Sequence, residues 1–259
     1  MRVSCLCVTS PERRPRLAGA VEAYLAQTHA SRELVVVLHG SEEQAGEHRQ
    51  MLTPLAGQGV RLLVAPGAMP LGAVRNVAID AARGDVLCQW DDDDVHHPSR
   101  IQRQLEAMVG GDAKACFLQE LLHFFEDPGD LYVENWKNSE HRSHPGTVMV
   151  RRESTARYPE LGAEASRGED SVYARALVAE GPVVHLAGRP ELFVYVHHGR
   201  NTYASSHHMM LATSLGLSRG LLLRRRPEIE RWIAEIPSIA ARGVRVMGSH
   251  GEAFSVRPS

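Results

Sequence analysis

The first half of the chain alternates short apolar runs with segments of helical pattern, and this alternation constrains the fold more than any other feature. The apolar runs are Val3–Thr9, Leu34–Leu38, Val60–Val64 and Val86–Trp90. The segments of helical pattern are Arg16–Gln27, Ser41–Leu55, Gly72–Ala82 and Pro98–Val109. Strands separated by helices of this length predict βαβ units. We therefore expect an α/β fold with a mostly parallel, Rossmann-like central sheet that is flanked by helices.

The second half of the chain has a less regular pattern. Its expected strands are Ala115–Phe125, Leu131–Trp136, Thr147–Val150, Val183–Leu186 and Leu192–Val196, of which the first two would form a hairpin. A helix is expected at Gly168–Ala179, and helices dominate from residue 204 onward, including Pro227–Ile236. Because no repeat or low-complexity linker interrupts the chain, we expect one compact domain over residues 1–203, with halves 1–110 and 111–203. A helical extension would follow over residues 204–259.

Charge and hydropathy exclude several classes of protein. The chain has 29 Lys and Arg against 31 Asp and Glu, a formal net charge of −2, so nothing in its charge favours a nucleic-acid partner. No apolar run approaches the roughly 18–20 residues that span a bilayer, so we expect no integral membrane segment. The N-terminus lacks the pattern of a signal peptide.

These absences favour a cytoplasmic protein that can associate peripherally with the inner face of a membrane. The basic segment Leu221–Arg226 fits a solvated helix end better than a lipid-binding patch. The four cysteines (Cys5, Cys7, Cys88 and Cys116) lie in apolar strands, and we expect reduced, buried thiols.

Polar clusters follow three of the predicted strands, at Thr9-Ser10-Pro11, at His39-Gly40-Ser41 and at Asp91–Asp94. Ligands of open α/β sheets bind at the carboxyl ends of the strands, so these clusters should meet at one edge. The four adjacent carboxylates of Asp91–Asp94, which we call the acidic loop, repel one another and indicate a bound Mg²⁺ or Mn²⁺. The alternative is a solvated loop in which Asp94 caps the next helix.

Segments in the same order along residues 1–203 resemble those of family 2 nucleotide-sugar glycosyltransferases, which have the GT-A fold. They are Val3–Arg13, Gln27-Thr28, Gly72–Asn76, Asp91-x-Asp93-Asp94-x-x-x-Pro98, Arg151-Arg152, Gly168-Glu169-Asp170 and Tyr195–Thr202. The resemblance implies a GT-A-like fold and a metal-dependent, inverting transfer of a sugar. The donor would be a nucleoside diphosphate sugar, and the acceptor would be a hydroxyl group.

The resemblance also implies roles for individual residues. Asp170 would be the general base. The metal ligands for Mn²⁺ or Mg²⁺ would be Asp91, Asp93 and His198. The donor contacts would be Thr9, Pro11, Arg75 and Asp92, and Glu169 would lie on the acceptor side. Apart from the resemblance, a histidine at position 39 can hydrogen-bond or stack on a nucleobase, so His39 is a further candidate donor contact. His144, in a loop before a strand, and Trp136, whose indole could stack on a sugar, are further candidates for the acceptor side. Other interpretations stay open: Glu169 and Asp170 also suit any helix N-terminus, Arg75 could be a surface arginine, and Trp136 could be a core residue.

Two departures from the family pattern bear on the donor. Leu38 and His39 stand where the family usually has acidic residues, the later of which contacts the nucleobase, and Val196 stands in place of an arginine. A UDP-linked sugar is favoured, while guanosine or deoxythymidine diphosphate sugars remain open.

Two further function classes compete with sugar transfer. One is a metal-dependent phosphoesterase or nucleotidyltransferase, and the other is a non-catalytic nucleotide-sugar-binding homologue. The acceptor, which could be a saccharide, a lipid-linked molecule, a peptide or a small molecule, is not readable from the sequence, nor is the oligomeric state.

Overall fold

The structure is a computed structural model that describes residues 1–258. The chain forms two compact units that interleave along the sequence. The first unit comprises Met1–Phe117 and His144–Leu186, and the second comprises Leu118–Ser143 and the residues from Ala187 onward. Within residues 1–258, no helix is long and apolar enough to cross a membrane.

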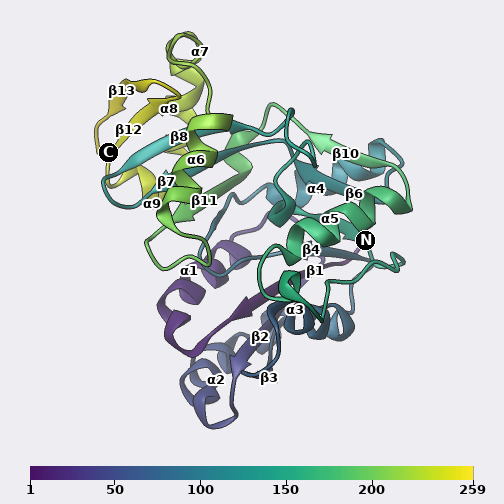
Figure 1. Cartoon of the computed structure of the whole chain (residues 1–259). Helices are drawn as coiled ribbons and strands as arrows, with labels where there is room; N and C mark the ends of the chain where they lie inside the picture. The colour runs from purple at the N-terminus through teal and green to yellow at the C-terminus, as the bar shows by residue number, and fades with distance from the viewer. Residues whose placement is uncertain (259) are drawn as a thin grey trace. The chain divides into compact units, whose positions relative to one another are not determined.

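The first unit contains a sheet with the strand order β10-β6-β9-β4-β1-β2-β3, in which Figure 1 shows β1, β2 and β3 side by side. Its strands are β1 (Val3–Thr9), β2 (Arg32–Gly40), β3 (Val60–Pro66), β4 (Val86–Gln89), β6 (Ala115–Leu118), β9 (Met149–Arg151) and β10 (Val183–Leu186), and the two-residue strand β5 (Val95–His96) lies outside this sheet. Its helices are α1 (Arg14–Leu25), α2 (Gly46–Leu52), α3 (Leu71–Ala81), α4 (Arg100–Gly110) and α5 (Glu169–Glu180). The pairs β4–β1, β1–β2 and β2–β3 are parallel, whereas β9 is antiparallel to both β4 and β6.

Strand β2 shows why this sheet is covered on both faces. Successive side chains of a strand point to opposite faces, so an unbroken apolar run must be buried on both. Leu34 and Val36 pack into a core cluster with residues of α1 and α4. Val35 and Val37 pack into another cluster with residues of α3. The predicted mostly parallel α/β sheet, flanked by helices, is therefore confirmed.

The second unit contains a sheet with the strand order β13-β12-β8-β7-β11. Its strands are β7 (Glu120–Phe125), β8 (Asp130–Asn135), β11 (Phe193–His197), β12 (Val244–Gly248) and β13 (Gly251–Val256). Its helices are α6 (Ser205–Leu215), α7 (Arg219–Arg224), α8 (Arg226–Ala234) and α9 (Pro237–Ala240). Strands β7 and β8 form the predicted antiparallel hairpin, and β12 pairs in parallel with β8.

Several element predictions need correction. The run Ala115–Phe125 is two strands, because the chain leaves one sheet at Gln119 and enters the other. The segment Ser41–Leu55 is not one continuous helix, because 3-10 turns flank the short helix α2 on both sides. The C-terminal part is helical as expected but also contributes the hairpin β12–β13. All four cysteines are free and buried, as predicted, and the expected domain boundary at residue 203 stays a prediction.

Candidate active site

The acidic loop follows β4, and buried side chains hydrogen-bond to the backbone at its start. Arg100, which is fully buried, donates hydrogen bonds to Nδ1 of His96 and, at 3.1 Å, to the carbonyl oxygen of Gln89. Because an arginine only donates, Nδ1 of His96 accepts, and the proton of the neutral ring lies on Nε2. That nitrogen donates to the carbonyl oxygen of Asp91 at 3.1 Å. The His96 ring also stacks on Trp90, with ring centroids 3.8 Å apart, so the loop has a rigid base.

The predicted role of Asp94 as a helix cap is wrong. Helix α4 begins at Arg100, and its N-cap residue is Ser99. The short strand β5 lies between Asp94 and this helix, which places the carboxylate too early in the chain to reach the helix N-terminus.

Thr9, at the end of β1, confirms that the strand ends converge. Its hydroxyl donates to Oδ2 of Asp92 at 2.6 Å. Arg13 donates to Oδ1 of Asp92 and to Oδ2 of Asp93, both at 2.7 Å. Burial, followed by the charge of Asp93, raises the pKa of Asp92 to about 7. Thr9 and Arg13 therefore hold the two central carboxylates of the loop in place.

The two outer carboxylates of the loop reach the surface, whereas the one between them does not. The side chains of Asp91 and Asp93 keep 21% and 12% of their exposure, against 1% for Asp92. Within residues 1–258, no group of three or more His, Cys, Asp and Glu side chains has an arrangement that could hold a metal ion. Mg²⁺ and Mn²⁺ are commonly held by one or two carboxylates together with substrate phosphates, and Asp91 and Asp93 fit that donor set.

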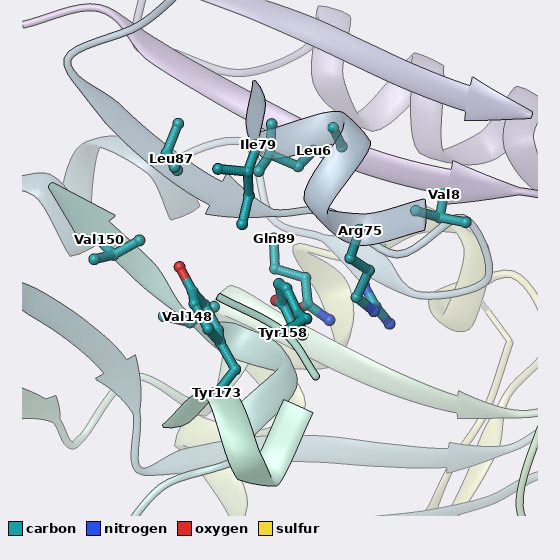
Figure 2. Close-up of a pocket in the computed structure, with 11 residues that line it drawn as sticks. Leu6, Val8, Arg75, Ile79, Leu87, Gln89, Val148, Val150, Tyr158 and Tyr173 are labelled. Carbon is teal, nitrogen blue, oxygen red and sulfur yellow. The ribbon is translucent and has the colours of Figure 1, made fainter. Parts of the chain in front are cut away.

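Arg75 joins the acidic loop to the start of α5. Its NH1 group donates to Oδ1 of Asp91 at 3.2 Å, and its Nε donates to Oε1 of Glu169 at 3.0 Å. Figure 2 shows Arg75 reaching from α3 toward Gln89 and Tyr158. Arg75 is therefore no solvated surface arginine, because two carboxylates from distant segments share it.

Asp170 lies in the first turn of α5, where Gly168 directs the chain into the helix. Gly168 has φ +85°, a left-handed conformation that suits glycine. The backbone N–H of Ser171 donates to Oδ1 of Asp170 at 2.7 Å, which lowers the pKa of that carboxyl. Burial and the charge of Glu169 outweigh this effect and raise the pKa of Asp170 to about 6.

The remaining candidates of the first unit lie around these carboxylates or at the same sheet edge. A Cβ atom at Gly146 would lie 3.1 Å from Cε1 of His144 and 3.6 Å from Oδ2 of Asp91, so His144 lies near Asp91. His39 is the second-last residue of β2, and its buried Nε2 has no hydrogen-bond partner among residues 1–258. Pro11 begins a 3-10 turn after β1 and touches the chain next to His39, because a Cβ at Gly40 would lie 3.2 Å from Pro11 Cγ.

His198 and Trp136 belong to the second unit. Nδ1 of His198 accepts a hydrogen bond from the backbone N–H of Arg200 at 3.2 Å, which leaves the proton of a neutral ring on Nε2. Metal ligation through Nε2 would require the other neutral tautomer, with the proton on Nδ1, and therefore the loss of this hydrogen bond. Trp136 is 8% exposed, and its indole N–H donates to Oε2 of Glu134 at 2.9 Å. That geometry favours a core role for Trp136, and its predicted acceptor contact stays a prediction.

Three residues of the site were missed by sequence reasoning: Arg13, Gln89 and Tyr158. Gln89 carried a signal, since it is a polar residue at the end of an otherwise apolar strand. Arg13 pairs with residues about 80 positions away, and Tyr158 with one 69 positions away. No local pattern reveals such pairs.

Comparisons with known proteins agree with this geometry. The profile of the Glycosyl transferase family 2 matches residues 5–157. An uncharacterized glycosyltransferase of Nostoc sp. is 32% identical over 98 residues, which cover 37% of this chain and 30% of that protein. The chain thus matches less than a third of that relative's length.

Two solved structures are similar in fold. Residues 1–349 of TarS from S. aureus, in complex with UDP, match with a TM-score of 0.62 at 14% identity, covering 93% of this chain and 80% of that one. The mannosyltransferase PcManGT from Pyrobaculum calidifontis, in complex with GDP-Man and Mn²⁺, matches with a TM-score of 0.56 at 12% identity, covering 90% and 63%.

A parallel α/β sheet with carboxylates at the carboxyl ends of its strands, together with these neighbours, defines a GT-A-like fold. Since the family profile spans more than half of the sequence, the chain belongs to glycosyl transferase family 2.

Proposed function

We propose that this chain is a metal-dependent, inverting glycosyltransferase that moves a sugar from a nucleoside diphosphate sugar to an acceptor hydroxyl. The observation that carries the proposal is the link made by Arg75, which ties Asp91 of the acidic loop to Glu169, the neighbour of Asp170. A candidate donor site is thereby hydrogen-bonded to the residue next to the candidate base. The neighbours solved with UDP and GDP-Man support a nucleoside diphosphate donor.

The residues of the acidic loop fit a divalent cation. Asp91 and Asp93 present oxygen donors that reach the surface. A bound Mn²⁺ or Mg²⁺ would supply Lewis-acid stabilisation of the charge that develops on the leaving diphosphate. His198 is the proposed third protein ligand.

Asp170 is proposed to act as the general base. Its carboxylate takes the proton of the acceptor hydroxyl while the hydroxyl oxygen attacks the anomeric carbon and the bond to the diphosphate breaks. Attack from the face opposite the leaving group inverts the anomeric configuration. A pKa of about 6 suits this role, because the group is ionised at neutral pH and still basic enough to accept a proton.

Thr9, Pro11, His39, Arg75 and Asp92 are the proposed donor contacts, and Glu169, Trp136 and His144 are proposed for the acceptor side. His39 could pair with a nucleobase through its buried Nε2, which is free of hydrogen bonds within the described part of the chain. We propose a UDP-linked donor first, with GDP- and dTDP-sugars as the comparison.

Thermal unfolding with a panel of nucleoside diphosphates and their sugars, with and without Mn²⁺, tests donor and metal together. A ligand of the native state raises the melting temperature by mass action. We expect a shift with one nucleotide that needs Mn²⁺. The absence of a metal-dependent shift with every nucleotide would overturn the proposal.

Asp170→Asn tests the base. We expect turnover to collapse while the variant keeps the donor-induced shift. A non-catalytic homologue would show binding but no turnover in the wild type as well.

We propose that the protein is cytoplasmic and that it contacts the inner face of a membrane peripherally. Leu223 and Arg224, both exposed, are the residues of the basic segment that could meet a lipid surface, because Arg225 and Arg226 pair with Glu228 and Glu230. Sedimentation with anionic vesicles tests this contact, and protein that stays in the supernatant would exclude it.

A further inference from the structure

Gln89 is a buried polar residue whose side chain connects two parts of the candidate site. It ends the apolar strand β4 and is 4% exposed. The hydroxyl of Tyr158 donates to its Oε1 at 2.7 Å, and its Nε2 donates to Oδ2 and Oδ1 of Asp91 at 3.0 and 3.3 Å. Figure 2 shows Gln89, Tyr158 and Arg75 grouped beside a small cavity that is otherwise lined mainly by apolar side chains.

The direction of these hydrogen bonds fixes the orientation of the amide. A carboxylate only accepts hydrogen bonds, so the amide NH₂ group must face Asp91, and the amide oxygen then faces Tyr158 and accepts from its hydroxyl. A flipped amide would set its oxygen against Asp91, which also carries only acceptors. Burial raises the pKa of Tyr158 well above its usual value, so the phenol keeps its proton.

Tyr158 is itself held in place by two elements. The side chain of Asn76 accepts from the backbone N–H of Tyr158 at 3.1 Å and donates to its carbonyl oxygen at 3.0 Å. The ring of Tyr158 stacks on Tyr173 of α5, with centroids 4.1 Å apart. The cavity beside Gln89 measures about 10 Å³, room for about one water molecule, so the amide has few alternative partners.

Gln89 and Arg75 act differently on the same carboxylate. Arg75 brings a positive charge, which Asp91 shares with Glu169. The amide of Gln89 is neutral, so it orients the carboxylate without cancelling the charge that a cation needs. Groups that hydrogen-bond to a metal-binding carboxylate typically change metal affinity by roughly 10–100-fold when they are removed.

We propose that Gln89, oriented by Tyr158, is a positioning residue that holds the carboxylate of Asp91 ready for a divalent cation. The inference rests on the proposed function, because it takes Asp91 as a metal-binding residue. It assigns a role to two buried residues that lie outside the acidic loop and would not touch the donor.

The test compares Gln89→Met, Tyr158→Phe and the double variant with the wild type. Methionine keeps the approximate volume of glutamine and removes both hydrogen bonds, and phenylalanine removes only the hydroxyl that orients the amide. The readout is Mn²⁺ affinity in the presence of UDP, measured from the electron paramagnetic resonance signal of free Mn²⁺. We expect Gln89→Met to weaken Mn²⁺ binding by roughly 10-fold or more, and Tyr158→Phe to weaken it less. The double variant should be no weaker than Gln89→Met, since both changes break one chain.

Activity gives a second readout with a specific pattern. At saturating Mn²⁺, kcat of each variant should return toward the wild-type value, because Asp170 is untouched. Tyr173→Phe is the matched control. It removes the hydroxyl from the ring that stacks on Tyr158 and leaves the hydrogen bonds from Tyr158 to Gln89 and from Gln89 to Asp91 intact, so Mn²⁺ affinity should not change.

The outcomes separate the inference from the proposed function. A wild type that binds neither Mn²⁺ nor UDP contradicts the proposed function itself. A wild type that binds both, beside variants that melt cooperatively and bind Mn²⁺ equally well, overturns the role of Gln89 alone. If Gln89→Met does not fold, Tyr158→Phe decides, and unchanged Mn²⁺ affinity in that variant overturns the proposal.

Discussion

Asp170 is a carboxylate on which opposing effects act, and the effects that raise its pKa are the stronger ones. The N-terminal end of α5 and the N–H of Ser171 favour its ionised form, whereas burial and Glu169 favour the protonated form. The result is a pKa of about 6. The same side chain would be a poor base at a lower pKa and would remain protonated at neutral pH at a much higher one.

This balance predicts the pH dependence of transfer. A general base must be ionised, so kcat/KM for the acceptor should fall roughly tenfold for each pH unit below about 6 and level off above it. Initial rates at constant ionic strength and saturating Mn²⁺ measure the profile. A rate that does not change from about pH 5 to about pH 8 would exclude Asp170 as the base.

Arg13 predicts a second effect at the scale of single residues. It neutralises Asp92 and Asp93 from a side chain that is 27% exposed. Arg13→Met should lower the free energy of unfolding without metal by roughly 1–3 kcal/mol, because two carboxylates lose their partner. Added Mn²⁺ should then raise the melting temperature more in the variant than in the wild type. Arg14→Met, whose partner Glu47 is exposed, is the control, and equal Mn²⁺ effects in all three proteins would contradict the argument.

At the scale of elements, α3 is the helix that assembles the site. Arg75 holds Asp91 and Glu169, and the adjacent Asn76 holds the backbone of Tyr158. Both contacts need α3 to lie close to the segment that precedes α5. Gly72 permits this approach, because a Cβ atom there would lie 2.0 Å from the carbonyl oxygen of Pro159.

Gly72→Ala should therefore lower both stability and activity. The new methyl group collides with backbone, so α3 and the Pro159 segment must separate, at a cost of roughly 1–3 kcal/mol. Gly19→Ala is the matched control in a helix, since nothing lies within 4 Å of a Cβ there. It should raise the free energy of unfolding by roughly 0.5–1 kcal/mol. Urea denaturation of both variants measures the difference, and equal effects would contradict this view of Gly72.

Elements were predictable where their signal is local. The run at Leu34–Leu38 is apolar throughout, and the acidic loop directly follows a strand, so both could be placed from the sequence. The hairpin β12–β13 was missed because β12 is stabilised by pairing with β8, more than a hundred residues earlier. The break at Gln119 was missed because the polar pair Gln119-Glu120 lies between two apolar runs and contains no Gly or Pro that would signal a turn.

The candidate site follows the same rule. Asp91, Asp93 and Asp170 could be named from short motifs that fix chemistry within a few residues. Two of the residues that surround them could not, because Arg13 reaches Asp92 and Asp93, and Tyr158 reaches Gln89, only through the fold. Gln89 lies two residues before Asp91, but its contact with that carboxylate depends on a side-chain orientation that no motif encodes.

At the scale of the whole molecule, the family match covers only part of the candidate site. The family profile ends at residue 157, whereas Asp170 and His198 lie beyond it. The proposed roles of these two residues therefore rest on the resemblance of their own short segments and, for Asp170, on its position in the first turn of α5. The first unit is built from two separate stretches of the chain. Asp91 and Asp93 lie in the first stretch, and Asp170 lies in the second, which begins at His144.

The raised pKa of Asp170 also has a consequence for the stability of the whole molecule. Its pKa is about 6 in the folded chain and about 3.9 for an unperturbed aspartate. Ionisation therefore favours the unfolded state, and the wild type loses stability as pH rises through 6. Asp170→Asn removes this loss, so the variant should exceed the wild type by roughly 1–2 kcal/mol at about pH 8 and lose that advantage by about pH 4.

Urea denaturation of wild type and Asp170→Asn across this pH range measures the difference. A catalytic carboxylate is expected to be retained at the expense of stability, whereas a carboxylate that only favours a helix N-terminus should stabilise the fold when ionised. A variant that is less stable than the wild type at about pH 8 would therefore assign Asp170 to the helix and not to the chemistry.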